Sequence, residues 1–214
     1  MYPRGVPRAF LDDAARTAFA GAITATESVS AAEIVVAVRV RSRVWLHVHL
    51  IVGLVAAWLG LAFMLYSDYT FGLAQFLIDP LVLGGLAGAA STLSPGLVRL
   101  LTPAGIRRRA VATDARAAFY ERGVHHTTGR SGVLVYVAVT ERMAALVADD
   151  GVVRAVEPRT WAKACAAIDA AVAHGGEATA RAVAALAPIL SVAMPRHVED
   201  VNELPDAIDE GVRR

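Results

Sequence analysis

The chain has 214 residues, of which 56% are hydrophobic and 19% are charged, and its formal net charge is +1. This apolar content exceeds the roughly 45–50% of ordinary soluble domains. A nearly neutral chain offers no general attraction for nucleic acid. Cys165 is the single cysteine, so an intramolecular disulfide is excluded.

The first part of the chain predicts one helix and one strand. Residues 8–27 favour a helix, with two aspartates near its start, where negative charge suits the helix dipole. Residues 32–38 are rich in β-branched side chains and predict a short strand. Three arginines then occupy alternate positions: Arg39, Arg41 and Arg43.

Two apolar runs follow. Residues 44–66 contain no Asp, Glu, Lys or Arg. A helix of that length measures roughly 35 Å, which is enough to cross a bilayer core of about 30 Å. The second run covers residues 80–98. Together the runs predict a transmembrane pair of helices over residues 44–101, with the lipid bilayer as a partner.

The start of the second membrane helix has two interpretations. Asp79 can cap a helix that begins at Pro80, which is the interpretation we favour because it explains both residues. Alternatively the helix begins near Phe71 and Asp79 lies within the bilayer, where an acid suggests a functional site.

Small residues in the second run predict close helix packing. Gly84 and Gly88 form a GxxxG pattern, which allows two helix backbones to approach each other. The first span is the simplest partner for this face, and a homodimer is the alternative.

The distribution of arginines predicts the orientation in the membrane. Arginines precede the first run and follow the second, whereas the connecting loop has Asp68 and no Arg or Lys. We therefore expect a protein of the inner (plasma) membrane that crosses it twice. By the positive-inside rule, both of its termini should lie in the cytoplasm.

The remaining sequence predicts a second strand pair between helices. Residues 132–139 form a continuous apolar run, typical of a strand buried on both faces. Residues 144–148 follow after a turn too short for a crossover, so they predict an antiparallel neighbour. Helices are expected at residues 102–122, 157–173 and 178–192. The first and second strands should therefore be parallel.

Few residues suggest chemistry, and no nucleotide-binding or zinc motif is present. Asp149 and Asp150 end the last predicted strand and could bind Mg²⁺ or Ca²⁺, and Arg130 could contact an anion such as phosphate. In open α/β sheets ligands bind beyond strand ends, which makes this corner the candidate site. His125 and His126 are adjacent and fit a shared metal poorly.

Several stretches resemble the TPM domain family, which includes thylakoid-lumen phosphatase-like and photosystem II repair proteins. The similar segments are residues 30–42, 117–152 and 200–206, together with Trp161 in its helix. A bacterial subgroup is also similar in carrying a membrane hairpin after the first strand. The resemblance implies a Rossmann-like α/β/α sandwich with a mixed sheet, formed by residues 1–43 and 102–194 around an inserted hairpin.

The resemblance also directs the functional hypotheses. Some relatives are described as acid phosphatases or divalent-ion binders, and others as membrane assembly or repair factors. The acidic site of the relatives would fall on Asp149 and Asp150. Because the sequence has a membrane anchor but no nucleophile, we expect a non-catalytic interaction or maintenance factor. The alternative is a cation-dependent phosphatase near the membrane. Residues 195–214 are expected to form a polar tail.

Overall fold

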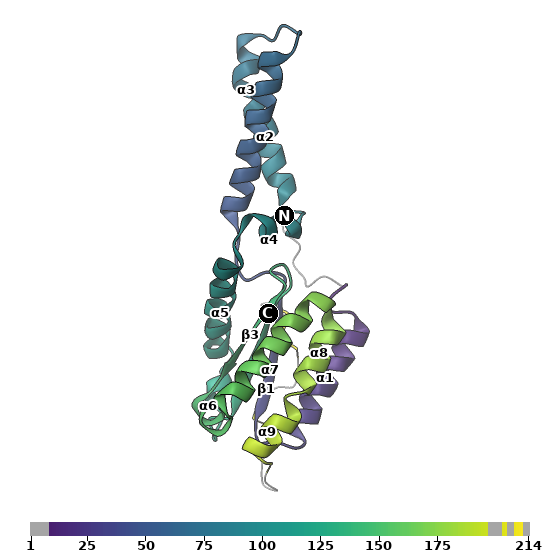
Figure 1. The fold of residues 1–214 in the computed structure, drawn as a ribbon, viewed down its shortest axis with the longest axis vertical. Helices are drawn as coiled ribbons and strands as arrows, with labels where there is room; N and C mark the ends of the chain where they lie inside the picture. Colours follow the sequence, from purple (N-terminus) through teal and green to yellow (C-terminus); the bar gives the residue numbers. More distant parts are fainter. Residues whose placement is uncertain (1–8, 197–202, 205–207, 212–214) are drawn as a thin grey trace. The chain divides into compact units, whose positions relative to one another are not determined.

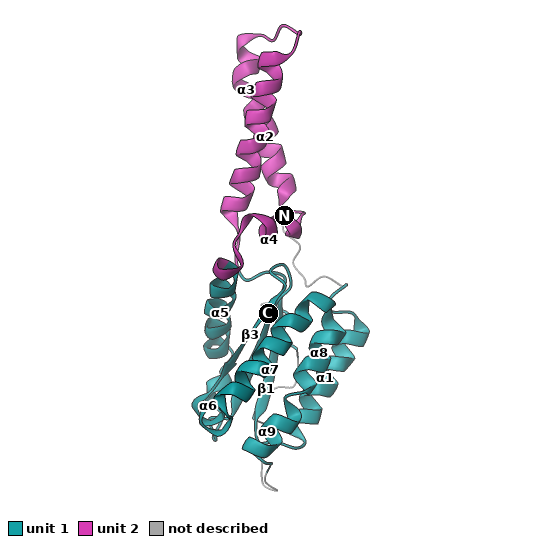
Figure 2. Ribbon diagram, viewed as in Figure 1, with its two compact units in different colours: residues 1, 3–42, 107–214 teal, residues 2, 43–106 magenta. Residues whose placement is uncertain are grey.

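The computed structural model describes residues 9–196, 203–204 and 208–211 (Figure 1). The chain forms two compact units, coloured separately in Figure 2. Residues 3–42 and 107–214 are assigned to the first unit, and residues 43–106 to the second. The second unit is thus an insertion into the first.

The first unit contains a mixed sheet of three strands in the order β1-β2-β3. The strands are β1 (Glu33–Arg39), β2 (Gly132–Ala138) and β3 (Met143–Ala148). The pairing of β1 with β2 is parallel, from Glu33 opposite Gly132 to Arg39 opposite Ala138. The pairing of β2 with β3 is antiparallel. Both predicted pairings are confirmed.

Helices cover both faces of this sheet (Figure 1). Alternate residues of a strand point to opposite faces. Val36 and Val135 pack against α1 (Asp13–Glu27), α7 (Pro158–Ala171), α8 (Gly176–Ala184) and α9 (Ala187–Ala193). On the other face, Leu134 and Tyr136 pack against α5 (Ala104–Glu121). β2 is buried along its whole length, as its continuous apolar run predicts.

Short elements complete the first unit. The 3₁₀ turn η1 (Val124–His126) precedes β2, and α6 (Asp150–Ala155) follows β3. The 3₁₀ turn η2 (Val172–His174) lies between α7 and α8. The prediction missed α6 as a separate helix, although Asp149 and Asp150 are typical of a helix start.

The second unit consists of α2 (Leu46–Tyr66), α3 (Leu73–Ser91), α4 (Pro95–Leu101) and the first residues of α5. Helices α2 and α3 pack against each other. A Cβ atom added to Gly84 would lie 2.7 Å from the carbonyl oxygen of Gly53, and one added to Gly88 would lie 3.0 Å from that of His49. Gly84 and Gly88 therefore serve the contact with α2, which was the simpler of the two predicted uses.

The favoured start of the second apolar helix is wrong. α3 begins at Leu73 and has Pro80 in its interior, so Asp79 does not cap it. Gly72 precedes the helix, and its N–H donates to Oε1 of Gln75 at 2.7 Å. Asp79 is exposed on the helix surface. A proline within an apolar helix is tolerated in membranes because other groups satisfy the freed carbonyl.

Part of the predicted polar tail belongs to the first unit. Asp209 forms a parallel bridge with Ala37, on the edge of β1 that β2 does not occupy. Ile208 packs against the core, and so does Leu204 on the other face of the sheet. The sequence prediction placed no structure here, because residues 208–211 are too few and too polar to resemble a strand.

Candidate functional site

The predicted acidic corner lies where β3 passes into α6. Asp149 is the N-cap of α6, and its Oδ1 accepts a hydrogen bond of 2.7 Å from the N–H of Asp150. Its side chain is 7% exposed, whereas that of Asp150 is 73% exposed. Asp150 lies near Arg154, one helical turn on, at 4.0 Å. The two adjacent carboxylates therefore occupy different environments.

Arg130 lies beside this corner. Its Nη1 is 3.6 Å from Oδ1 of Asp149, and its side chain is 63% exposed. The backbone at Arg130 has a positive φ of 49°. Its carbonyl accepts a hydrogen bond of 3.0 Å from Gly151, where a Cβ atom would lie 2.5 Å from that same oxygen. Gly151 thus allows the loop to pack directly on the start of α6.

The corner lies at the amino ends of the parallel strands. β1 and β2 begin at Glu33 and Gly132, and antiparallel β3 ends beside them at Ala148. The rule that locates ligands beyond strand ends applies to the carboxyl ends of parallel strands. That rule therefore gives no support to a site at Asp149.

A pocket of about 460 Å³ also lies at this end of the sheet. Its polar lining includes Glu33, Thr128, Ser131 and Glu203. Glu203 accepts from the backbone N–H of Thr128 at 2.7 Å and from its hydroxyl. These hydrogen bonds lower the pKa of Glu203 below its ordinary value. The pocket wall is thus partly built by the end of the chain.

Few side chains near Asp149 could serve as ligands for a cation. Within residues 9–196, 203–204 and 208–211, no three His, Cys, Asp or Glu side chains are grouped so that they could hold a metal ion. Oδ2 of Asp149 is buried and has no hydrogen-bond partner among the described residues. That oxygen fits a cation, but Mg²⁺ would take most of its six ligands from water.

The opposite end of the sheet contains a buried acid that the sequence did not reveal. Glu141, in the turn between β2 and β3, is 0% exposed. Its Oε1 accepts from the N–H of Ser42 at 3.1 Å and from the Ser42 hydroxyl at 3.0 Å. Its carbonyl accepts from Arg107 at 2.8 Å. Glu141 thus contacts the last residue before the insertion and the first residue after it.

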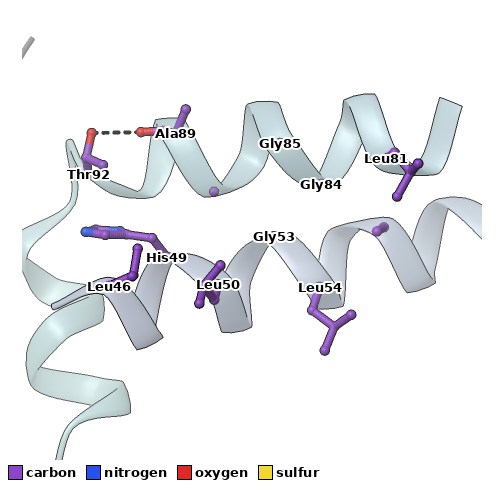
Figure 3. A pocket seen from close by; sticks show the side chains of 12 residues that line it. Leu46, His49, Leu50, Gly53, Leu54, Leu81, Gly84, Gly85, Ala89 and Thr92 are labelled. Carbon is purple, nitrogen blue, oxygen red and sulfur yellow. Dashed lines mark hydrogen bonds between the residues drawn. The ribbon is translucent and has the colours of Figure 1, made fainter. Parts of the chain in front are cut away.

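The second unit has its own groove, between α2 and α3, with a volume of about 500 Å³ (Figure 3). Its lining is apolar except near Thr92 and His49. Nδ1 of His49 lies 2.7 Å from Oγ of Ser91, and that hydroxyl donates to the Gly88 carbonyl. The hydrogen bond between His49 and Ser91 links the two helices at one end of the groove.

The histidines and the cysteine considered in the sequence have different surroundings. The rings of His125 and His126 are 3.9 Å apart, and His125 also contacts Phe119 and Tyr120. These contacts fit an aromatic cluster at the end of α5. Cys165 is half-buried in α7, and burial raises the pKa of its thiol, which makes it a poor nucleophile.

Comparisons with known proteins inform the fold alone. No family model and no curated protein matches the chain. A solved structure that is similar is the NMR structure of the BA42 protein from the psychrophilic bacterium Bizionia argentinensis. The similarity has a TM-score of 0.55, 16% sequence identity and 92% coverage of each chain. At this identity the two proteins share an architecture, and nothing follows about activity.

Proposed function

We propose that this chain is a membrane-anchored, Rossmann-like α/β domain of the TPM type that acts as a non-catalytic interaction or assembly factor at the cytoplasmic membrane surface. The observation that carries the proposal is the apolar surface of α2 and α3. Leu54, Trp58 and Phe63 in α2 are 72%, 66% and 68% exposed. Leaving such side chains in water costs about 1.5–3 kcal/mol each relative to burial.

Lipid is the occupant that fits this surface. α2 and α3 are long and apolar enough to cross a membrane, and large apolar side chains cover their outward faces. The glycine contacts between the helices are of the kind that membrane helices use. We infer that α2 and α3 form a transmembrane hairpin inserted between β1 and the elements that follow it.

A third segment, Gly176–Ala193, is also apolar enough to span a membrane. We assign it to the α/β domain because it forms two helices, α8 and α9, and contributes to the core. Val183, Leu186 and Leu190 are each 0% exposed and pack in the cluster that covers one sheet face. This assignment leaves two spans, with Arg41 and Arg43 before them and Arg107–Arg109 after them in the cytoplasm.

The non-catalytic part of the proposal rests on the acidic corner. Asp149 has a structural task as the cap of α6 and as a partner of Arg130. Its neighbour Asp150 is solvated. A phosphatase site needs groups that stabilise a developing negative charge or attack phosphorus. Arg130 can do the former, whereas the nearby hydroxyls of Thr127 and Thr128 are held in hydrogen bonds with Ser131 and Glu203.

Two measurements test the proposal. The full chain should remain in the membrane pellet after alkaline carbonate extraction. Purified in detergent with Mg²⁺, it should hydrolyse p-nitrophenyl phosphate no faster than a matched preparation of Asp149→Asn. Release into the carbonate supernatant would overturn the anchor, and turnover that is abolished in Asp149→Asn would overturn the non-catalytic role.

A second candidate is a divalent-cation-dependent phosphatase, favoured by the buried and unpartnered Oδ2 of Asp149. In that case Asp149 would bind Mg²⁺ or Ca²⁺ and Arg130 would hold a phosphate oxygen. The pair Arg130→Lys and Arg154→Lys provides a matched test, because Arg154 lies on the exposed side of the same corner. Turnover that falls in the first variant alone supports this candidate.

A further inference from the structure

The outer edge of β1 is covered by a short piece of the chain's own end. The N–H of Asp209 donates to the Val36 carbonyl at 2.9 Å, and the N–H of Val38 donates to the Asp209 carbonyl at 2.8 Å. These two hydrogen bonds add Asp209 to the sheet beside Ala37, in parallel orientation. An uncovered strand edge readily pairs with another chain, so this edge can accept an extended segment.

Arginines from three elements recognise the acidic side chains of this segment. Oδ2 of Asp209 contacts Nη2 of Arg39 in β1 and lies 2.7 Å from Nε of Arg122, just after α5. The Asp209 carbonyl accepts from Nη1 of Arg39 at 2.7 Å. Glu210 pairs through both oxygens with Arg16 of α1. Three cations thus surround two adjacent acids.

The residues on either side of the two acids, Ile208 and Gly211, fit the edge through packing and backbone conformation. Ile208 packs against the main core cluster. Gly211 has a φ of 73°, and its N–H donates to Oδ1 of Asp209 at 2.9 Å. A Cβ atom at Gly211 would lie 3.0 Å from the Arg39 side chain. The edge therefore accommodates an apolar residue, an Asp, a second acid and a Gly, in that order.

We propose that the outer edge of β1, with Arg16, Arg39 and Arg122, is a binding site for an extended acidic peptide of a partner protein. Residues 208–211 of the chain occupy this site as an internal competitor. Strand addition of this kind obtains affinity from backbone hydrogen bonds and specificity from pockets for individual side chains. The proposal does not depend on membrane insertion, so it can fail or succeed independently of the anchor.

Residues 208–211 are held at the edge of β1 by few contacts, so a competing peptide could displace them. Only Asp209 forms a bridge with β1 among the described residues of the tail, whereas β2 pairs with β1 along seven residues. Arg16 and Arg122 remain 43% and 41% exposed, so solvent and salt reach their ion pairs. A competing peptide can therefore replace these contacts one at a time.

The test uses the full chain in detergent and a labelled peptide with the sequence of residues 203–214. We expect saturable binding to a variant that ends at residue 207, and at least tenfold weaker binding to the intact chain, because the tethered segment competes at a high effective concentration. The matched control is the same peptide with Asp209→Ala, which should bind at least tenfold more weakly to the shortened variant. Equal binding of both peptides, or no saturable binding, would overturn the proposal.

A second variant covers the case in which the shortened chain does not fold. Full-length Asp209→Ala should release its own tail and bind the wild-type peptide at least fivefold more tightly than the unmodified chain. Arg39→Ala should remove that gain, whereas Arg159→Ala in α7 should not. Failure of Asp209→Ala to bind better would overturn the proposal. A concentration-dependent dimer that this substitution abolishes would assign the edge to tail exchange between copies, and would also overturn it.

Discussion

The backbone N–H of Ser42 donates to Oε1 of Glu141 across 3.1 Å, and that carboxylate is fully buried. Ser42 is the last residue before the inserted unit, and Arg107, the first residue after it, donates to the Glu141 carbonyl. One turn residue thus holds the two points where the chain leaves and rejoins the α/β unit.

Replacing Glu141 should therefore destabilise the α/β unit. Glu141→Ala removes the acceptor of two hydrogen bonds from the half-buried Ser42, at a cost of about 1–3 kcal/mol. Glu141→Gln keeps an acceptor and should cost less. Thermal unfolding in detergent measures both. Glu121→Ala, exposed at the end of α5, is the control, and an equal effect in it would contradict this role.

Alanine substitutions at the adjacent glycines Gly84 and Gly85 of α3 should have very different effects on stability. A Cβ atom at Gly84 would lie 2.7 Å from the Gly53 carbonyl oxygen, whereas one at Gly85 would meet nothing within 4 Å. Gly84→Ala should destabilise the α2–α3 pair by about 1–3 kcal/mol through overpacking. Gly85→Ala should be neutral or slightly stabilising. Thermal unfolding of the purified chain distinguishes them, and equal midpoints would argue against the packing described.

Asp149 and Asp150 should contribute differently to the free energy of unfolding. Asp149→Ala removes the cap of α6 and the partner of Arg130, so it should lower the free energy of unfolding by about 1–2 kcal/mol. Asp150→Ala should change it by less than about 0.5 kcal/mol, because its carboxylate is solvated. Denaturant titration in detergent measures both values. A larger loss of stability in Asp150→Ala than in Asp149→Ala would contradict the assignment of Asp149 as the cap of α6.

Tail docking should weaken in acid. Burial alone would raise the pKa of Asp209, but the hydrogen bond from Arg39, the N–H of Gly211 and the two arginine charges outweigh it, so the pKa is lowered. The docked tail is therefore stabilised above the ordinary Asp pKa of about 3.9, and this stabilisation is lost as the pH falls through the lower folded value.

The contribution of Asp209 to the pH dependence of stability can be measured with Asp209→Asn, whose side chain does not titrate. The stability difference between the unmodified chain and this variant should be constant near neutral pH and should shrink below pH about 4. Unfolding midpoints at a series of pH values supply the measurement. A difference that grows on acidification would have the wrong sign and would contradict the lowered pKa.

Membrane orientation can be read with single cysteines in a Cys165→Ala background. Asp68→Cys, in the loop between α2 and α3, should react with an impermeant maleimide in intact cells. Arg109→Cys in α5 should react after the cells are opened. The reverse pattern would place the α/β domain outside the cytoplasm and refute the orientation predicted by the arginines.

Strand identity and pairing could be predicted because the β-branched run in β1 and the fully apolar β2 leave few alternatives. The start of α3 could not, because Asp79 and Pro80 form a local cap signal that the longer apolar helix overrides. Glu141 lies in a short turn, where a charged side chain is ordinarily exposed. Its burial depends on Ser42, which is distant in sequence, and no local pattern signals such a partner.

The residues of the candidate site could be named from the sequence, but the end of the sheet at which they lie could not. Asp149, Asp150 and Arg130 do lie in one region, but the antiparallel direction of β3 puts them at the amino ends of the parallel strands. The arginines around Asp209 were missed as a group because Arg16, Arg39 and Arg122 come from three separate elements. Only the folded sheet brings them to one edge.

The parallel pairing of β1 with β2 sets an order of events during synthesis. Glu33 must wait for Gly132 to leave the ribosome before it can pair, and both apolar helices are made in the interval. If those helices enter the bilayer as they emerge, the sheet closes only over a hairpin that is already inserted. Until Gly132 has been made, β1 therefore has two unpaired edges, and during that interval it can pair with another chain.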